Sequence, residues 1–278
     1  MTGGLTASIV TPHTPRMGIE AQAPEFVRGL IAGSRELGGV VRGLKPDLIV
    51  LQTAHWVSTF NWYVTAHAVH QGICVAEEAP DMIPGVPYRR PGDPEYARAL
   101  AEAIRGAGIP CGINETPHYH WDYGTYVPLA YIDPEGSIPV VTLPTVLMSD
   151  LAECRRVGRV AHETAARLGR RAVFISSCAL SHKLVRGPEQ WPAKGRQDLD
   201  RRLVELMENG RVRELVAWSP AWCEEAVAEM GGRTISGMIG AMEAMEQTAG
   251  ALRGRQIGPY GQSSGSGNAT VCVTPVGA

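Results

Sequence analysis

The fold is decided by a pattern that first occurs at LTASIVTPHTP, Leu5–Pro15. Its first part, Leu5–Val10, is a short apolar run with β-branched residues, which is typical of a strand buried on both faces. The second part places His13 between two prolines, which stiffen the backbone and disfavour helix just before them. We therefore predict a buried strand that ends in a rigid loop presenting an imidazole.

Two further apolar runs are followed by a histidine. Leu48–Thr53 runs into Ala54-His55-Trp56, and Ala172–Ser177 is followed a few residues later by His182. In an open α/β sheet, ligands bind beyond the carboxyl ends of the strands. We expect the three imidazoles to lie at that edge, where His13 and His55, from strands that could be neighbours, can face one metal ion.

Strand-like and helical patterns alternate along the whole chain. Strands are predicted over Leu5–Val10, Leu48–Thr53, Cys111–Asn114, Ile138–Leu143, Ala172–Ser177 and Ala269–Val273. Helices are predicted over Glu25–Arg42, Pro94–Ala107, Leu151–Leu168, Gln197–Met207, Ala221–Ala228 and Ile235–Gly250. This alternation predicts an α/β fold, with a mostly parallel or mixed central sheet and helices on both faces.

The organisation of the chain indicates a single domain over residues 1–278, because no composition break or linker is evident. Ile83–Asp93 is rich in Pro and Gly and is expected to be a long surface loop. The late region Gln197–Gly250 is expected to be almost all helix, packed over the strand ends.

Composition argues against several classes of protein. The net charge is −2 and no Lys/Arg block occurs, so neither nucleic acid nor a membrane surface is an expected partner. No apolar run approaches the roughly 20 residues needed to span a bilayer, and no signal peptide is evident. The six cysteines are scattered, which is typical of reduced thiols. These features predict a cytoplasmic protein.

The residues alone leave alternatives open. His13 or His55 taken singly could be a ligand or a loop histidine bonded to backbone. Glu229 closes an Ala/Glu-rich helical stretch, and composition does not distinguish it from Glu224 and Glu225. Ser181 or Cys178 beside His182 permits a nucleophile, although no Gly-x-Ser-x-Gly elbow occurs.

Several segments, spread over nearly the whole chain, carry a resemblance to a known family. They are Thr11–Pro15, Thr53–Trp56, Asp122–Thr125, Ala179–His182, Ala228-Glu229 and Gly265–Asn268. With them the chain resembles the class III extradiol ring-cleaving dioxygenases of the protocatechuate 4,5-dioxygenase superfamily. It is most similar to the homoprotocatechuate 2,3-dioxygenase and 2-aminophenol 1,6-dioxygenase catalytic-subunit branches.

The resemblance implies Fe(II) held by His13, His55 and Glu229, a ligand set that leaves one face of the iron open. A catechol or 2-aminophenol derivative and O2 would meet there, and the aromatic ring would be opened. His182 would be the acid/base, since an ordinary imidazole pKa of about 6.5 suits proton transfer at neutral pH. Tyr123 is either a hydrogen-bond partner of the substrate or oxygen intermediate, or a buried structural tyrosine.

Other interpretations are kept beside this one. The chain could be a non-catalytic subunit or interaction protein of the same fold, or a zinc-dependent hydrolase on that scaffold. Relatives of this family assemble, so a homo-oligomer, with or without a second subunit, is expected. Arg16, Arg186 and His120 are unranked candidate partners for a substrate carboxylate.

Overall fold

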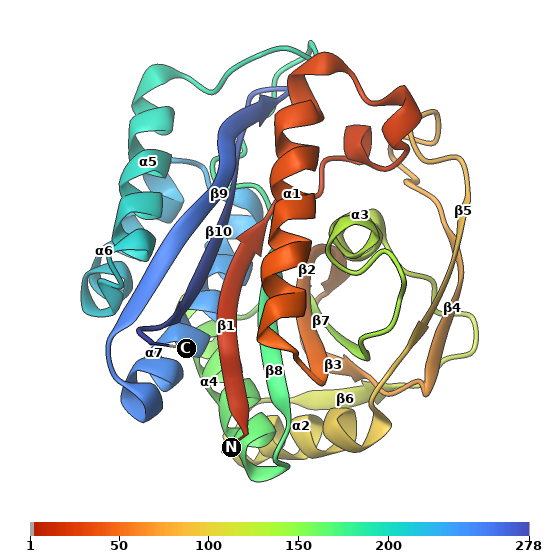
Figure 1. Ribbon diagram of the computed structural model, residues 1–278, viewed down its shortest axis with the longest axis vertical. Coiled ribbons are helices and arrows are strands. Elements are labelled where there is room, and N and C mark those ends of the chain that lie inside the picture. The colour runs from red at the N-terminus through yellow and green to blue at the C-terminus, as the bar shows by residue number, and fades with distance from the viewer. Residues whose placement is uncertain (1–2, 278) are drawn as a thin grey trace.

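A computed structural model describes residues 3–277. The main sheet contains six strands in the order β7-β2-β8-β1-β10-β9 (Figure 1). These strands are β7 (Val140–Val146), β2 (Leu48–Ser58), β8 (Arg171–Ser177), β1 (Gly4–Thr11), β10 (Ser266–Pro275) and β9 (Leu252–Ser263). The first four are parallel to one another, β10 pairs antiparallel with β1, and β9 pairs antiparallel with β10. The mixed sheet predicted from the sequence is confirmed.

Helices cover both faces of this sheet (Figure 1). On one face lie α1 (Glu25–Leu44) and α3 (Tyr123–Ile132). The core on the other face is built by α2 (Pro94–Gly106), α4 (Leu151–Arg167), α5 (Lys194–Glu208), α6 (Val212–Glu225) and α7 (Arg233–Ala249). Along β2, Ile49 and Leu51 enter the first core while Leu48 and Val50 enter the second. A strand buried on both faces has no polar face to show, so it appears in sequence as one apolar run.

Two small sheets flank the main one. β3 (Trp62–Thr65) pairs parallel with β6 (Cys111–Asn114), and β4 (Val69–Cys74) pairs antiparallel with β5 (Val86–Pro91). The expected loop Ile83–Asp93 was therefore wrong over β5. The sheet of β4 and β5 has only two strands, so β5 is an edge strand, where proline is tolerated because no ladder bond need be lost.

The late helices also differ from expectation. The helix predicted over Ala221–Ala228 is α6, which ends at Glu225, so Glu229 does not close a helix. α7 packs against a face of the sheet, and α5 lies beside β9 and β10, rather than over the strand ends. Their apolar sides pack against the hydrophobic core, which lies along the faces of the sheet and not beyond the strand ends.

Two chemical features of the chain complete the fold. All six cysteines are free, and five of them are buried. Within residues 3–277, the helices are too short or too polar for any of them to cross a bilayer.

Candidate metal centre

The three histidines singled out in the sequence lie at the carboxyl edge of the parallel strands. His13 follows β1, and His182 follows β8. β1 and β2 are not neighbours, because β8 lies between them. His55 does not follow its strand but lies within β2, just past Thr53, where pairing with β8 ends. The register of β2 against β7 shifts between Gln52 and Val57, and this irregularity spans His55.

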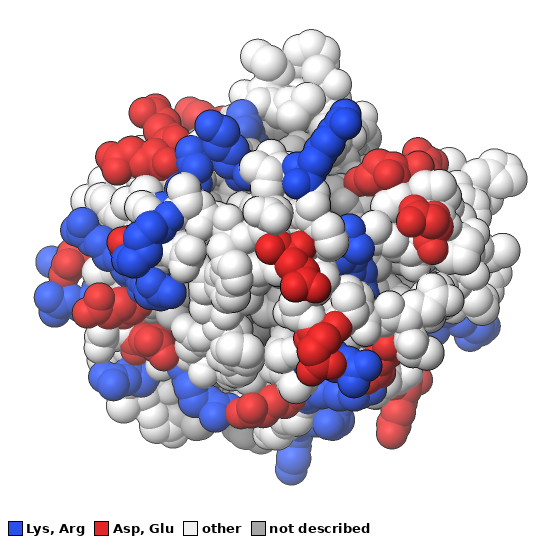
Figure 2. Space-filling model, turned by 90° about the horizontal axis from the view of Figure 1, so that it is seen from above, with Lys and Arg blue, Asp and Glu red and all other residues white. Residues whose placement is uncertain are grey.

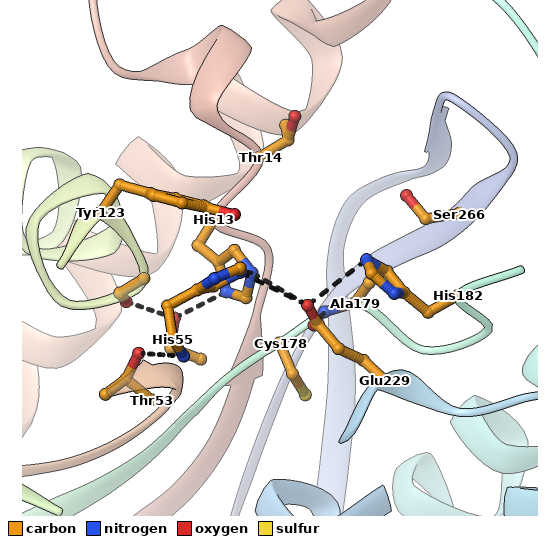
Figure 3. A network of polar contacts seen from close by, with 12 residues as sticks. His13, Thr14, Thr53, His55, Tyr123, Cys178, Ala179, His182, Glu229 and Ser266 are labelled. Carbon is orange, nitrogen blue, oxygen red and sulfur yellow. Dashed lines mark hydrogen bonds and ion pairs between the residues drawn. The ribbon is translucent and has the colours of Figure 1, made fainter. Parts of the chain in front are cut away.

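Three donor atoms of this edge converge on one point (Figure 3). Nε2 of His13 lies 3.1 Å from Nε2 of His55, and Oε1 of Glu229 lies 3.3 Å and 3.5 Å from these two atoms. Bonds from a metal ion to imidazole or carboxylate are about 2.0–2.2 Å long, so ligand atoms at right angles lie about 3 Å apart. The triangle therefore fits one cation bound on a single face.

His13 is turned toward this point by a hydroxyl. The Oγ atom of Ser177, the last residue of β8, lies 3.0 Å from Nδ1 of His13 and donates to the carbonyl of Gly124 at 2.5 Å. The hydroxyl has one proton, so it accepts from Nδ1–H of the imidazole. That tautomer leaves the lone pair of His13 on Nε2, where a metal would bind.

His55 is fixed through the start of α3. Its backbone N–H donates to Oγ1 of Thr53, which donates to Oδ1 of Asp122 at 2.7 Å. The Asp122 carboxylate also caps α3 by accepting from the N–H of Thr125. A Cβ on Gly124 would lie 2.5 Å from Oγ1 of Thr53, so only glycine fits there. The Asp122–Thr125 segment is thus a helix cap that orients a histidine.

Glu229 is held by a tight turn. It starts a 3₁₀ turn, Glu229–Gly232, in which Gly231 and Gly232 have positive φ angles of 65° and 75°. Its Oε2 accepts from the N–H of Ala179 at 2.6 Å, which leaves Oε1 facing the histidines. Burial alone would raise the pKa of Glu229, but the imidazoles beside its carboxylate, first of all that of His13, bring this pKa well below its ordinary value.

His182 contacts the same carboxylate from the other side (Figure 3). Its Nε2 lies 3.4 Å from Oε1 of Glu229, yet it is outside the set of donor atoms within 4.8 Å of one another. Burial lowers the pKa of His182 from 6.5, with Glu229 opposing and the other two histidines reinforcing that shift. A neutral imidazole beside, but not inside, the ligand set can accept a proton.

The nucleophile interpretation has no support in the geometry. Ser181 is fully buried and its hydroxyl donates to Asp200 at 2.6 Å. Burial raises the pKa of the Cys178 thiol to about 12, so its thiolate is scarce at neutral pH.

Sequence reasoning missed Glu78, on the connection between β4 and β5. Its Oε1 accepts the hydroxyl of Tyr123 at 2.7 Å and lies 3.3 Å from Nδ1 of His55. Burial and Glu78 raise the pKa of Tyr123, so this phenol stays protonated. The ring centroids of Tyr123 and His55 are 4.0 Å apart. Glu78 lies in an acidic loop pattern, so no sequence signal separates it from its neighbour Glu77.

A cavity of about 360 Å³ is lined by His13, His55, His182 and Tyr123. Among the candidate partners for a carboxylate, Arg16 lines this cavity, while His120 lines an adjoining cavity of about 310 Å³ and Arg186 lines neither. Figure 2 looks down on this end of the molecule, where the described acidic and basic side chains are interspersed without a broad area of one sign.

Comparison with known proteins identifies the family of the chain. Residues 7–261 match the family described as the catalytic LigB subunit of aromatic ring-opening dioxygenase. The chain belongs to this family, which confirms the resemblance and the predicted class of enzyme, an extradiol dioxygenase.

Individual relatives are distant but cover most of the chain. The 2-aminophenol 1,6-dioxygenase beta subunit of Pseudomonas sp is 27% identical, covering 97% of this chain and 93% of the relative. The alpha subunit of the same name is 25% identical, over 96% and 98%. The 3,4-dihydroxyphenylacetate 2,3-dioxygenase of Escherichia coli is 21% identical, over 73% and 76%.

A solved structure shares the fold. The uncharacterized protein JW3007 of Escherichia coli K12 superposes with a TM-score of 0.68 at 18% identity, covering 97% of this chain and 99% of that one.

Proposed function

We propose that this protein is a non-haem Fe(II)-dependent extradiol dioxygenase that opens the ring of a catechol or 2-aminophenol derivative with O2. The observation that carries the proposal is the triangle of His13, His55 and Glu229 donor atoms, 3.1–3.5 Å apart, beside a cavity that both histidines line. Two neutral imidazoles and one carboxylate are the ligand set of non-haem ferrous oxygenases. A single catalytic domain over the whole chain is part of this proposal.

Bound ferrous iron would supply adjacent open positions for the two ortho oxygen or nitrogen atoms of the ring and for O2, and a route for electrons between them. The protein's own part is orientation. Ser177 and Glu78 hold the tautomers of His13 and His55, and the N–H of Ala179 holds the second oxygen of Glu229. These bonds fix the direction of each ligand before substrate arrives.

His182 is the acid/base of the proposal. Its Nε2 takes the proton of a substrate hydroxyl, and the resulting imidazolium is stabilised by Oε1 of Glu229, 3.4 Å away. The same atom later returns the proton to the reacting oxygen. Tyr123 stays protonated, and its hydroxyl donates to the Glu78 carboxylate. In this proposal the ring of Tyr123 and that carboxylate together orient the substrate.

We also propose that the chain assembles with a second copy or with a related subunit. The support is that two relatives carry the names of an alpha and a beta subunit of one enzyme, and both match nearly the whole chain. Light scattering of the purified chain tests for a second copy. Light scattering after coexpression with a subunit related to the alpha or beta subunit above tests for a second kind of chain. The cytoplasmic location expected from the sequence stays a prediction.

The proposed reaction is tested by anaerobic loading with ferrous iron, followed by oxygen uptake and visible absorbance. The substrates are 3,4-dihydroxyphenylacetate, protocatechuate, catechol and 2-aminophenol, and a zinc-loaded sample is the matched control. We expect one O2 consumed per ring opened with iron and none with zinc. Ring opening with zinc and without iron would contradict iron dependence, and failure to bind any metal would favour a non-catalytic subunit.

A further inference from the structure

The segment from Cys178 to His182 carries two groups of the site, although it belongs to no helix or strand. The N–H of Ala179 donates to Oε2 of Glu229, and the imidazole of His182 contacts Oε1 of the same carboxylate. The direction of both groups depends on how this irregular backbone is held. Any loss of order in the segment would therefore reach the metal ligand and the acid/base together.

Neighbouring backbone holds the segment on two sides. On one side, the N–H of Leu180 donates to the carbonyl of Gly267 at 2.8 Å, and the N–H of Gly267 donates to Ser181 at 2.9 Å. On the other side, Ser181 forms an isolated bridge with Ala228. These bonds hold the backbone of the segment on both sides. They leave the N–H and the hydroxyl of Ser181 without a partner from these two neighbours.

Both remaining donors of Ser181 go to one carboxylate, that of Asp200 on α5. The N–H of Ser181 lies 3.1 Å and 3.3 Å from the two oxygens, and its hydroxyl donates to Oδ2 at 2.6 Å. The hydroxyl of Tyr260 donates to Oδ2 at 2.7 Å. Asp200 is fully buried, and among the described residues these neutral donors, rather than a cation, hold it.

The network leaves no room for a side chain at position 267. A Cβ on Gly267 would lie 2.1 Å from the hydroxyl of Tyr260 and 2.2 Å from Oδ2 of Asp200. Burying a carboxylate without a cation is costly unless its hydrogen bonds are made. The absence of a side chain at Gly267 leaves the space in which the donors of Ser181 and Tyr260 reach Asp200. The carboxylate itself does not line the cavity over the metal centre.

We infer that Asp200 is a positioning residue, which through Ser181 sets the direction of the His182 imidazole and of the N–H that holds Glu229. The inference rests on the proposed function of the site. A carboxylate that lies behind the ligands and orients them is worth about 10-fold to 100-fold in metal affinity or activity in other metal sites. Asp200 acts on two groups at once, so both quantities should fall.

The test compares Asp200→Ala, Asp200→Asn and wild type. Ferrous iron affinity is measured anaerobically against a colorimetric chelator, and kcat and KM are measured with the best substrate found. For Asp200→Ala we expect about a 10-fold to 100-fold loss in iron affinity and in kcat, with KM changed less than about threefold. Asp200→Asn keeps an acceptor for Ser181 and should recover most of both losses.

A matched control separates positioning from stability. Asp133 is also buried and accepts from the N–H of Ile138, but it lies at the end of α3 remote from Tyr123. Asp133→Ala should lower the melting temperature without changing iron affinity. If Asp200→Ala does the same, the inference is wrong.

Should Asp200→Ala not fold, Ser181→Ala removes the 2.6 Å bond alone, and unchanged iron affinity and kcat in that variant overturn the inference. The iron titration needs no substrate. An Asp200 effect on iron affinity in a protein that opens no ring would thus retain this inference while rejecting the proposed reaction.

Discussion

The hydroxyl of Ser177 stands 3.0 Å from Nδ1 of His13, and the same hydroxyl donates to the carbonyl of Gly124. One serine at the end of β8 therefore joins the loop after β1 to the first turn of α3. This relationship fixes a tautomer, because a hydroxyl whose proton is committed can only accept from the imidazole. It also gives the first prediction.

Ser177→Ala should weaken iron binding about tenfold, because Nδ1–H of His13 loses its acceptor and the ring is free to turn. Competition with a ferrous chelator measures this affinity. Ser176, one residue earlier in β8, is equally buried and contacts Cys178 instead, so Ser176→Ala is the matched control. Equal affinities for the two variants would contradict the role of Ser177.

Glu78 and Glu77 form a second matched pair. Glu78→Gln weakens the acceptor of His55 Nδ1 and of the Tyr123 hydroxyl, so we expect iron affinity or kcat to fall by about tenfold. In the described part of the chain both contacts belong to Glu78, so its exposed neighbour Glu77 should tolerate the same change. The prediction fails if Glu77→Gln costs as much as Glu78→Gln.

The choice of carboxylate ligand can be tested with Glu229 and Glu225. Glu229→Ala, like His13→Ala or His55→Ala, should abolish stoichiometric iron binding and turnover, because two ligands cannot hold ferrous iron in this geometry. Glu225 is exposed at the end of α6, and Glu225→Ala should behave as wild type. Elemental analysis after anaerobic loading measures the bound iron. Iron lost in Glu225→Ala but kept in Glu229→Ala would move the ligand assignment to Glu225.

Much of this site could be predicted from the sequence, because its signals are local. The strands that carry His13 and His55 are apolar runs, and a histidine at a strand end is visible without coordinates. α3 was not predicted, since it is apolar on all sides and contains Pro128, so it shows no helical period. β9 was hidden by its glycines and Pro259.

The remaining parts depend on contacts between distant segments. Glu229 resembles Glu224 and Glu225 in composition, and only the turn that brings it to Ala179 distinguishes it. Ser177, Glu78 and Asp200 reach the site through partners far away in the chain, and common residue types such as these carry no signal by themselves.

His182→Gln should separate chemistry from metal binding. The glutamine removes the acid/base but no ligand, so iron affinity should stay within about threefold while kcat falls by about 10²–10⁴. The wild-type kcat should decline with acid as His182 becomes protonated, with a midpoint below about 6.5 because burial lowers the pKa of this imidazole. An acidic decline that persists unchanged in the variant would reject this role.

Acid stability can be predicted from His70, which is not one of the three candidate ligands. His70 is buried on β4, its Nε2–H donates to the carbonyl of Val140 at 3.0 Å, and burial lowers its pKa to about 4. In the unfolded chain the pKa is about 6.5, so between these values the unfolded state binds a proton that the folded state does not. The free energy of unfolding therefore falls as the pH drops from 6.5 toward 4.

The size of this loss follows from the two pKa values. A difference of about 2.5 units corresponds to about 3 kcal/mol, reached near pH 4 and constant below it. His70→Gln keeps an N–H donor but does not titrate. Urea unfolding of wild type and variant at pH 7.5, 6, 5 and 4 should show wild type losing about 3 kcal/mol relative to the variant. Parallel pH curves for the two proteins would mean that the pKa of His70 is the same in the folded and the unfolded state, and would contradict this prediction.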